Sequence, residues 1–339
     1  MAAGGITLVV RDAEGQAALR DAARELLGAI DGLEVAEAAG LPADAEPGRA
    51  YVLAAAPGEA ERAALRGALE PHALVTQVRY RSTLARQSPL RKKRIARLDL
   101  AVVAAQPGRE AEALALAADY AERRMGRLCT VSSPEGAPAW EAAVERERSG
   151  RPDVEFESLG AGDAAAALVA EPGRFDVVAT APALGDALIG QAIAITGTPT
   201  LYAAGVVGAG GAGAYYPFAA DPDQPDGFQN PLALALAAGL ALHLSLGRDD
   251  DGTVIEDAVD LALETGLRTP DIYAEQPGEM RAATQTLQRA LMKQLGWALG
   301  AEQPEASDGT GSGADAAPAD GPADGEPEAG APPTEGASS

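Results

Sequence analysis

The chain has 339 residues and carries 50 acidic against 27 basic side chains, for a formal net charge of −23. That length suits two domains or one large α/β unit, and the charge argues against nucleic acid or an anionic membrane as a general partner. Cys129 is the single cysteine, which excludes an intrachain disulfide. No signal pattern opens the sequence, and its longest apolar run, 232–246, is too short to span a bilayer. We therefore expect a cytoplasmic protein without a membrane partner.

The first hundred residues alternate the patterns of strands and helices. Apolar runs at 6–10 and 50–55 predict strands, and amphipathic segments at 16–30 and 57–69 predict helices. The segment 79–97 then carries eight basic side chains and no acidic one. The sequence alone favours a solvated basic face. The alternative is a patch that binds carboxylates, since arginine binds them through two parallel hydrogen bonds.

The middle of the chain continues the alternation. A buried strand is predicted at 98–105, and a helix at 109–124 follows almost directly. Further strands are predicted at 128–132 and 154–159, with a helix at 137–149 between them. This succession indicates an α/β protein.

The next segment begins with a buried strand predicted at 175–180, followed by a helix with Asp186 near its start, where a carboxylate is electrostatically favoured. The glycine-rich run 208–213 lacks the strand–turn–helix setting of a phosphate loop and is interpreted as a flexible connection. A helix at 232–246 is apolar on nearly all sides, which predicts burial in a core or an interface. From 301 to 339 the chain is rich in Pro, Gly, Ala and Ser, its charges are all acidic, and disorder is predicted.

Three motifs mark the second half of the chain. Gly185-Asp186 stands at a helix start, Asn230-Pro231 closes a Pro/Asp/Gly loop, and 268–272 reads Arg-Thr-Pro-Asp-Ile. In this order they resemble the isocitrate/isopropylmalate dehydrogenase family, the metal-dependent β-decarboxylating dehydrogenases. The resemblance implies that family's α/β fold, with two interleaved lobes and a shortened middle domain.

The same resemblance divides the chain into three parts. Residues 1–98 and 198–300 would form a large α/β lobe, which lies on the cofactor side in the family. Residues 99–197 would form the middle lobe, on the metal and dimer side. Residues 301–339 would be the disordered acidic tail.

The resemblance also implies site residues. Asp186 matches a metal ligand, and Asp163, at the start of another helix, matches an aspartate that reaches a neighbouring subunit's metal. An N-terminal helix cap is an equally good interpretation of Asp163. The sequence from Ser88 to Arg91, Ser-Pro-Leu-Arg, resembles the start of the substrate-binding arginine motif.

For the dinucleotide, the resemblance points to two residues of the Pro/Asp/Gly loop. Asp223 would take a ribose diol, and Asn230 would meet an adenine edge. Both residue types are equally ordinary in turns, which need no ligand. The implied cofactors are Mg²⁺ or Mn²⁺ together with NAD, and the departures below leave open that both have been lost.

Several family positions carry the wrong chemistry. The catalytic lysine position falls on Ser133, the second metal aspartate on Gly190, and a substrate arginine near Gln106. The segment that carries the family's catalytic tyrosine is missing. The two histidines, His72 and His243, lie in helix- or strand-like contexts typical of structural residues, and no Ser/His/Asp set emerges. No catalytic residue is therefore assigned.

These departures lead to three hypotheses. The first is a catalytically degenerate family member that acts as a regulatory or structural subunit. It would form a homo- or hetero-oligomer, and an active paralogue is one partner to consider. The second is an active NAD- and Mg²⁺-dependent oxidative decarboxylase of a 2-hydroxy acid such as isocitrate or isopropylmalate. The third is an interaction module that uses the acidic tail, which removal of the residues after about 300 would separate from the first.

Overall fold

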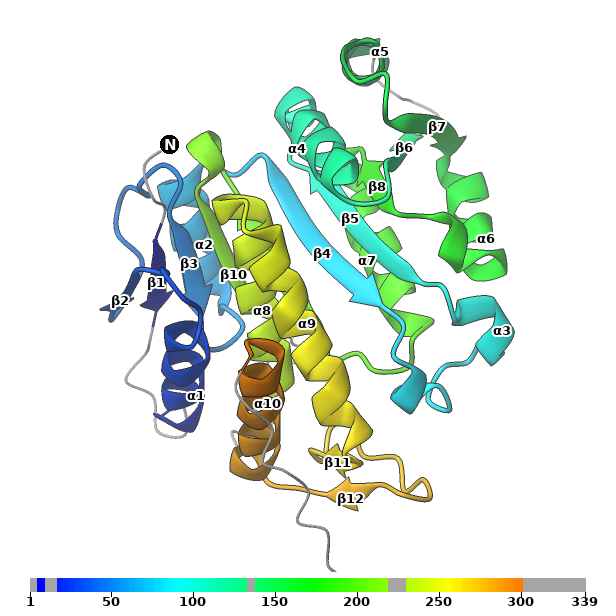
Figure 1. Cartoon of the computed structure of the whole chain (residues 1–339). Helices are drawn as coiled ribbons and strands as arrows, with labels where there is room; N and C mark the ends of the chain where they lie inside the picture. The colour runs from blue at the N-terminus through cyan, green and yellow to red at the C-terminus, as the bar shows by residue number, and fades with distance from the viewer. Residues whose placement is uncertain (1–4, 10–16, 133–137, 219–229, 301–339) are drawn as a thin grey trace, which may run out of the picture. The chain divides into compact units, whose positions relative to one another are not determined.

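The computed structural model describes residues 5–9, 17–132, 138–218 and 230–300 (Figure 1). Contacts between Cα atoms group Met1–Glu302 into one compact unit. The predicted acidic tail lies outside the described residues, so its disorder stays a prediction.

The structure has a strand in each segment where the sequence predicted one, and further strands that were not predicted. The strands of the main sheet are four to seven residues long. They are β1 (Ile6–Val9), β2 (Val35–Ala38), β3 (Ala50–Leu53), β4 (Ala73–Arg79), β5 (Asp99–Ala105), β6 (Arg127–Ser132), β7 (Glu155–Gly160), β8 (Val177–Thr180), β9 (Ala203–Val207) and β10 (Gly213–Pro217). They make one ten-stranded sheet in the order β2-β1-β3-β10-β9-β4-β5-β8-β6-β7. The pairs β10–β9, β9–β4 and β4–β5 are antiparallel, and the other pairs are parallel.

Helices cover both faces of this sheet (Figure 1). They are α1 (Ala17–Gly28), α2 (Glu59–Leu69), α3 (Lys92–Ile95), α4 (Glu110–Arg123), α5 (Pro138–Gly150), α6 (Ala161–Ala170), α7 (Gly185–Ala194), α8 (Pro231–Ala241), α9 (Asp249–Glu264) and α10 (Thr284–Ala298). Three short elements matter for the site: the 3₁₀ turn η1 (Ser82–Leu84), the π-helix η5 (Leu242–Leu246), and the ribbon of β11 (Leu267–Arg268) with β12 (Met280–Arg281). Among the described residues, no helix has both the length and the apolar composition needed to cross a bilayer.

The alternation of side chains along β5 separates two hydrophobic clusters. Ala101 and Val103 belong to the cluster that includes α4, α8 and α9, whereas Leu100 and Val102 belong to the cluster with α6 and α7. Helix α8 is buried along almost its whole length, against β9, β10 and α9. Its apolar composition is therefore explained by packing within this chain, without a subunit interface.

The sheet order bears on the expected lobes. Strands from 1–98 and 198–300 fill the half from β2 to β4, and strands from 99–197 fill the half from β5 to β7. The halves join through seven paired positions of β4 and β5 in one continuous sheet. The two-lobe division itself stays a prediction. The short connection predicted after β5 is present, since α4 begins at Glu110 soon after the strand ends at Ala105.

Candidate functional site

The expected metal ligand Asp186 lies in the first turn of α7, just after β8. Its neighbour Gly185 has a packing role, because an added Cβ would lie 2.2 Å from the Cβ of Ala104 on β5. Glycine therefore allows α7 to begin close against the sheet. The Asp186 side chain is exposed.

Few other ligands are available near Asp186. We call the region of α6 and α7 that carries Asp163, Asp186 and Gly190 the candidate metal edge. Gly190, one turn after Asp186, is exposed, and an added Cβ there would meet no atom within 4 Å. Asp163 is exposed in the first turn of α6. Across the described residues, no three His, Cys, Asp or Glu side chains are grouped so that they could hold a metal ion. A divalent cation needs several oxygen ligands, so the described part of a single chain does not fit one.

The expected substrate residues lie at the other end of α7. The Ser88 hydroxyl donates to the carbonyl oxygen of Ile195 at 2.6 Å and accepts from the Leu90 amide at 3.0 Å. Ile195 is the residue that ends α7, whose ten residues span about 15 Å. Ser88 and Asp186 are thus separated by roughly the length of α7, farther apart than one small acid reaches. Arg91 is exposed at the residue before α3.

Asn230 caps α8. Its Oδ1 accepts from the Leu232 amide at 3.0 Å, and its Nδ2 donates to Oδ2 of Asp271 at 3.1 Å. The second contact joins the Asn-Pro motif to the Arg-Thr-Pro-Asp-Ile motif. The carbonyl and the amino group of the Asn230 side chain therefore each have a partner within the fold. The expected contact with an adenine stays a prediction.

The same motif holds a buried ion pair. Arg268 is 3% exposed, its NH1 donates to the carbonyl oxygens of Leu263 and Leu267, and its Nε lies 3.5 Å from Glu279. Arg268 and Glu279 thus hold the chain together where α9 ends and β11 begins. Two expected site residues, Ser133 and Asp223, lie outside the described residues, so their roles stay predictions.

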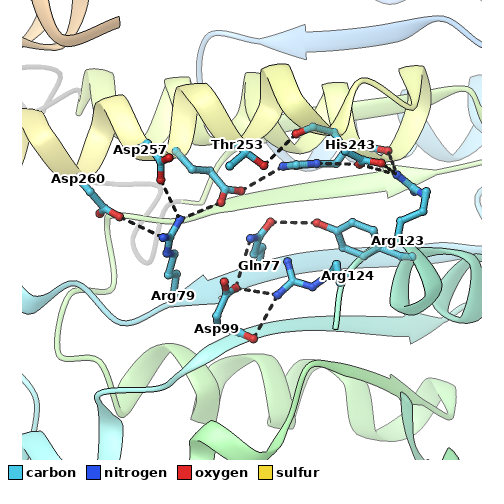
Figure 2. Close-up of polar contacts among 12 residues, drawn as sticks. Gln77, Arg79, Asp99, Arg123, Arg124, His243, Thr253, Asp257 and Asp260 are labelled. Carbon is cyan, nitrogen blue, oxygen red and sulfur yellow. Dashed lines mark hydrogen bonds and ion pairs between the residues drawn. The ribbon is translucent and has the colours of Figure 1, made fainter. Parts of the chain in front are cut away.

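A larger set of polar contacts lies elsewhere, where β4 and β5 meet α4 and α9 (Figure 2). We call it the central polar cluster. Its members are Gln77, Arg79, Asp99, Tyr120, Arg123, Arg124, Asp176, His243, Asp249, Glu256, Asp257 and Asp260.

Arg124 links the start of β5 to the residue just before β8. It donates to Asp99 and to Asp176, each at 2.8 Å, and the Asp176 carboxylate also accepts from the amides of Met125 and Arg127. Burial alone would raise the pKa of Asp99, but Arg124 outweighs it and holds the pKa below its usual range. Arg124 therefore has a carboxylate partner on each of these two segments.

His243 lies between two carboxylates of α9. Its Nδ1 is 3.0 Å from Asp249 and its Nε2 is 3.4 Å from Glu256, while Arg123 of α4 donates to its carbonyl oxygen (Figure 2). Gly252 leaves room for the ring, because an added Cβ would lie 2.5 Å from Nε2. Burial lowers the pKa of His243, but Glu256 and Asp249 outweigh this and raise it. The π-helix that carries His243 departs from regular α-helical geometry at this contact.

The basic run of the sequence divides into two parts. Arg79 lies 3.2 Å from Glu256 and 3.7 Å from Asp260 (Figure 2), and Arg81 also pairs with Asp260. These arginines are neutralised by α9 and are not free to hold a substrate carboxylate. This pairing was not predicted from the sequence. The acids at 256, 257 and 260 have the spacing of one helical turn, which is the pattern that could have indicated an acidic helix face.

Residues 114–291, just over half of the chain, match the model of the isocitrate/isopropylmalate dehydrogenase family. The chain belongs to this family, as the three motifs indicated. Members of the family use a divalent metal and NAD(P), and they typically form dimers.

Individual relatives match over a limited length. The 3-isopropylmalate dehydrogenases of Hydrogenovibrio crunogenus and Hahella chejuensis are each 34% identical over 185 residues, which is 53% of this chain and 51% of theirs. The chloroplastic 3-isopropylmalate dehydrogenase 1 of Arabidopsis thaliana is 32% identical over 185 residues and 45% of its length. The chain thus spans about half the length of the curated relatives it matches.

A solved structure shares the fold more widely. Isocitrate dehydrogenase from Methylococcus capsulatus superimposes with a TM-score of 0.63 over 86% of this chain and 99% of that one. The two sequences are 18% identical, so this likeness shows the fold alone.

Proposed function

We propose that this chain is a catalytically degenerate member of its family, acting as a regulatory or structural subunit beside a second copy or an active paralogue. The observation that carries the proposal is the candidate metal edge. Asp186 stands there exposed, with open space over Gly190 where the family pattern has a second carboxylate. Oxidative decarboxylation depends on a cation that polarises the hydroxyl, so weak cation binding removes the reaction's electrophile.

Further losses point the same way. Catalytic groups act as a unit, and the loss of several is seldom rescued by the remainder. The Ser88 hydroxyl donates a hydrogen bond to the residue that follows α7, and Arg79 and Arg81 form ion pairs with acids of α9. Asp163 would still reach a neighbouring subunit if the chain dimerises as its family does, which supports an assembly role for this edge.

The second candidate is an active NAD- and Mg²⁺-dependent oxidative decarboxylase. It is favoured by the 34% identity to two 3-isopropylmalate dehydrogenases. It would require the segments that carry Ser133 and Asp223, together with a partner chain, to complete the site.

One assay separates the candidates. The purified full chain is incubated with Mn²⁺ or Mg²⁺, NAD or NADP, and either isocitrate or 3-isopropylmalate, and reduced cofactor is followed by absorbance. The degenerate subunit gives no turnover with either acid, while a catalytic relative measured in parallel does. Turnover that disappears on addition of EDTA would overturn the proposal and establish the active enzyme.

A mixing experiment tests the subunit role. The chain is combined with a catalytic paralogue from the same cell, and the assembly is measured by size-exclusion chromatography with light scattering. Co-elution with a changed kcat or KM of the paralogue supports a regulatory subunit. Separate elution and unchanged kinetics contradict that role.

A further inference from the structure

The second part of the basic run is not neutralised. Its side chains are exposed, and none forms an ion pair with an acid among the described residues, in contrast to Arg79 and Arg81. We call this set the α3 basic surface, and it consists of Arg86, Arg91, Lys92, Lys93, Arg94 and Arg97. Unpaired cations gathered in a chain of net charge −23 mark a local positive field that favours anions.

A groove of about 480 Å³ adjoins this surface. It is bounded by η1 and its following turn, by the end of α9, and by β11 with the chain that leads to β12. Arg86 and Lys92 line it, as do Ser82 and Thr83. Its volume falls within the usual range of small-ligand sites.

The acids of the groove are largely compensated. The Glu279 carboxylate accepts from the amides of Ala274 and Gln276 and pairs with buried Arg268. The Nε of Arg268 has no hydrogen-bond partner among the described residues. Glu264, exposed at the end of α9, is the lining acid for which the described residues show no compensating contact.

Arg86 is held at the groove. Its NH1 donates to Oε1 of Gln276 at 3.0 Å, which joins the η1 side to the ribbon side. That contact leaves the remaining donors of the guanidinium available to a ligand. Lys92 begins α3 and is exposed with three donors of its own.

We propose that this groove binds a small polyanion, a molecule with two or more carboxylate or phosphate groups. Arg86 and Lys92 are its cationic contacts, and the hydroxyls of Ser82 and Thr83 are further donors. Ser88 and Arg91 do not line the groove, so the site is separate from the substrate residues implied by the family. The inference does not depend on whether the chain is catalytic.

Removing cations and removing an acid from the groove should change the affinity for an anion in opposite directions. The full chain is titrated with pyrophosphate and, separately, with tricarballylate, by calorimetry at low and moderate salt. Arg86→Gln with Lys92→Gln should weaken binding by roughly tenfold or more, since charge-assisted hydrogen bonds are lost. Glu264→Gln should tighten binding. Arg66→Gln, which removes an exposed cation on α2 outside the groove, is the matched control and should change little.

Each outcome decides the matter. Preference for pyrophosphate identifies a phosphate ligand, and preference for tricarballylate identifies a carboxylate ligand. Absence of binding by both probes overturns the proposal, as does equal weakening in the Arg66→Gln control and in the double variant. If the double variant does not fold by circular dichroism, Glu264→Gln alone decides, because unchanged affinity in that variant contradicts the site.

Discussion

The central polar cluster and the candidate metal edge belong to the same fold but are built differently. In the cluster, Asp176 has a fully buried side chain that accepts three hydrogen bonds, and Arg124 joins β5 to the residue before β8. At the edge, Asp163 and Asp186 are exposed, and Gly190 leaves open space. A fold can keep the charges that hold it together after losing those that only a reaction needs, because stability selects the former alone.

The largest difference should appear when one carboxylate is removed from each region. Asp176→Ala removes the acceptor of the Arg124 Nε and of two backbone amides in a buried place, which costs about 3–5 kcal/mol. Asp163→Ala removes an exposed carboxylate and should change stability by about 0.5 kcal/mol or less. Urea denaturation of both variants measures the two free energies of unfolding. Similar losses in the two variants would remove the contrast between the regions.

The two glycines of α7 give a second, smaller comparison. Gly185→Ala places a methyl group 2.2 Å from the Cβ of Ala104, and overpacking of this kind costs about 1–3 kcal/mol. Gly190→Ala meets no atom within 4 Å and should stabilise the exposed helix by about 0.5–1 kcal/mol. Thermal unfolding of the pair checks the opposite signs. A stabilising Gly185→Ala would show that the start of α7 can move away from β5.

The histidines offer a comparison through pH. His243 has a raised pKa, so its contribution to stability is complete below its unfolded pKa and is lost as pH rises through the folded value. His72 has a pKa lowered by burial and by Arg109, so its contribution is present above the unfolded pKa and is lost as pH falls through the folded value. His243→Gln should therefore destabilise more at pH 5.5, below the unfolded pKa of about 6.5, than at pH 9.

The matched variant is His72→Gln, which should show the reverse trend. Denaturation at several pH values, held above the range where carboxylates titrate, gives both profiles. Parallel profiles for the two variants would mean that the α9 carboxylates do not control the charge of His243.

The sequence predicted local structure better than it predicted contacts. The buried strands and the apolar helix α8 follow from patterns within a few residues, and the structure confirms them. The pairing of Arg79 with Glu256 joins residues 177 positions apart, so no local pattern announces it. The basic run was for this reason interpreted as one feature, although α9 neutralises one part and leaves the other exposed.

The candidate site shows the same limit. Asn230 was correctly placed before a helix, but the contacts of its amide depend on the fold, since Oδ1 caps α8 and Nδ2 donates to the distant Asp271. The exposure of Asp186 and the open space over Gly190 likewise come from packing against β5. Sequence motifs located these residues, and tertiary contacts determine what their side chains can do.

The smallest expected effect tests whether the edge can regain a function. Gly190→Asp places a second carboxylate one turn after Asp186, in space that is open. Two like charges at this spacing destabilise a helix by about 0.2–0.5 kcal/mol, so Gly190→Asp should be slightly less stable than Gly190→Asn, which has the same shape without the charge. Millimolar Mn²⁺ should reverse that order, because a cation shared by two carboxylates binds the folded helix in preference to the unfolded chain. Melting curves of both variants with Mn²⁺ and with EDTA supply the measurement. An Mn²⁺ response equal in both would mean that the carboxylates do not converge, and that the edge lacks the geometry of a metal site as well as its ligands.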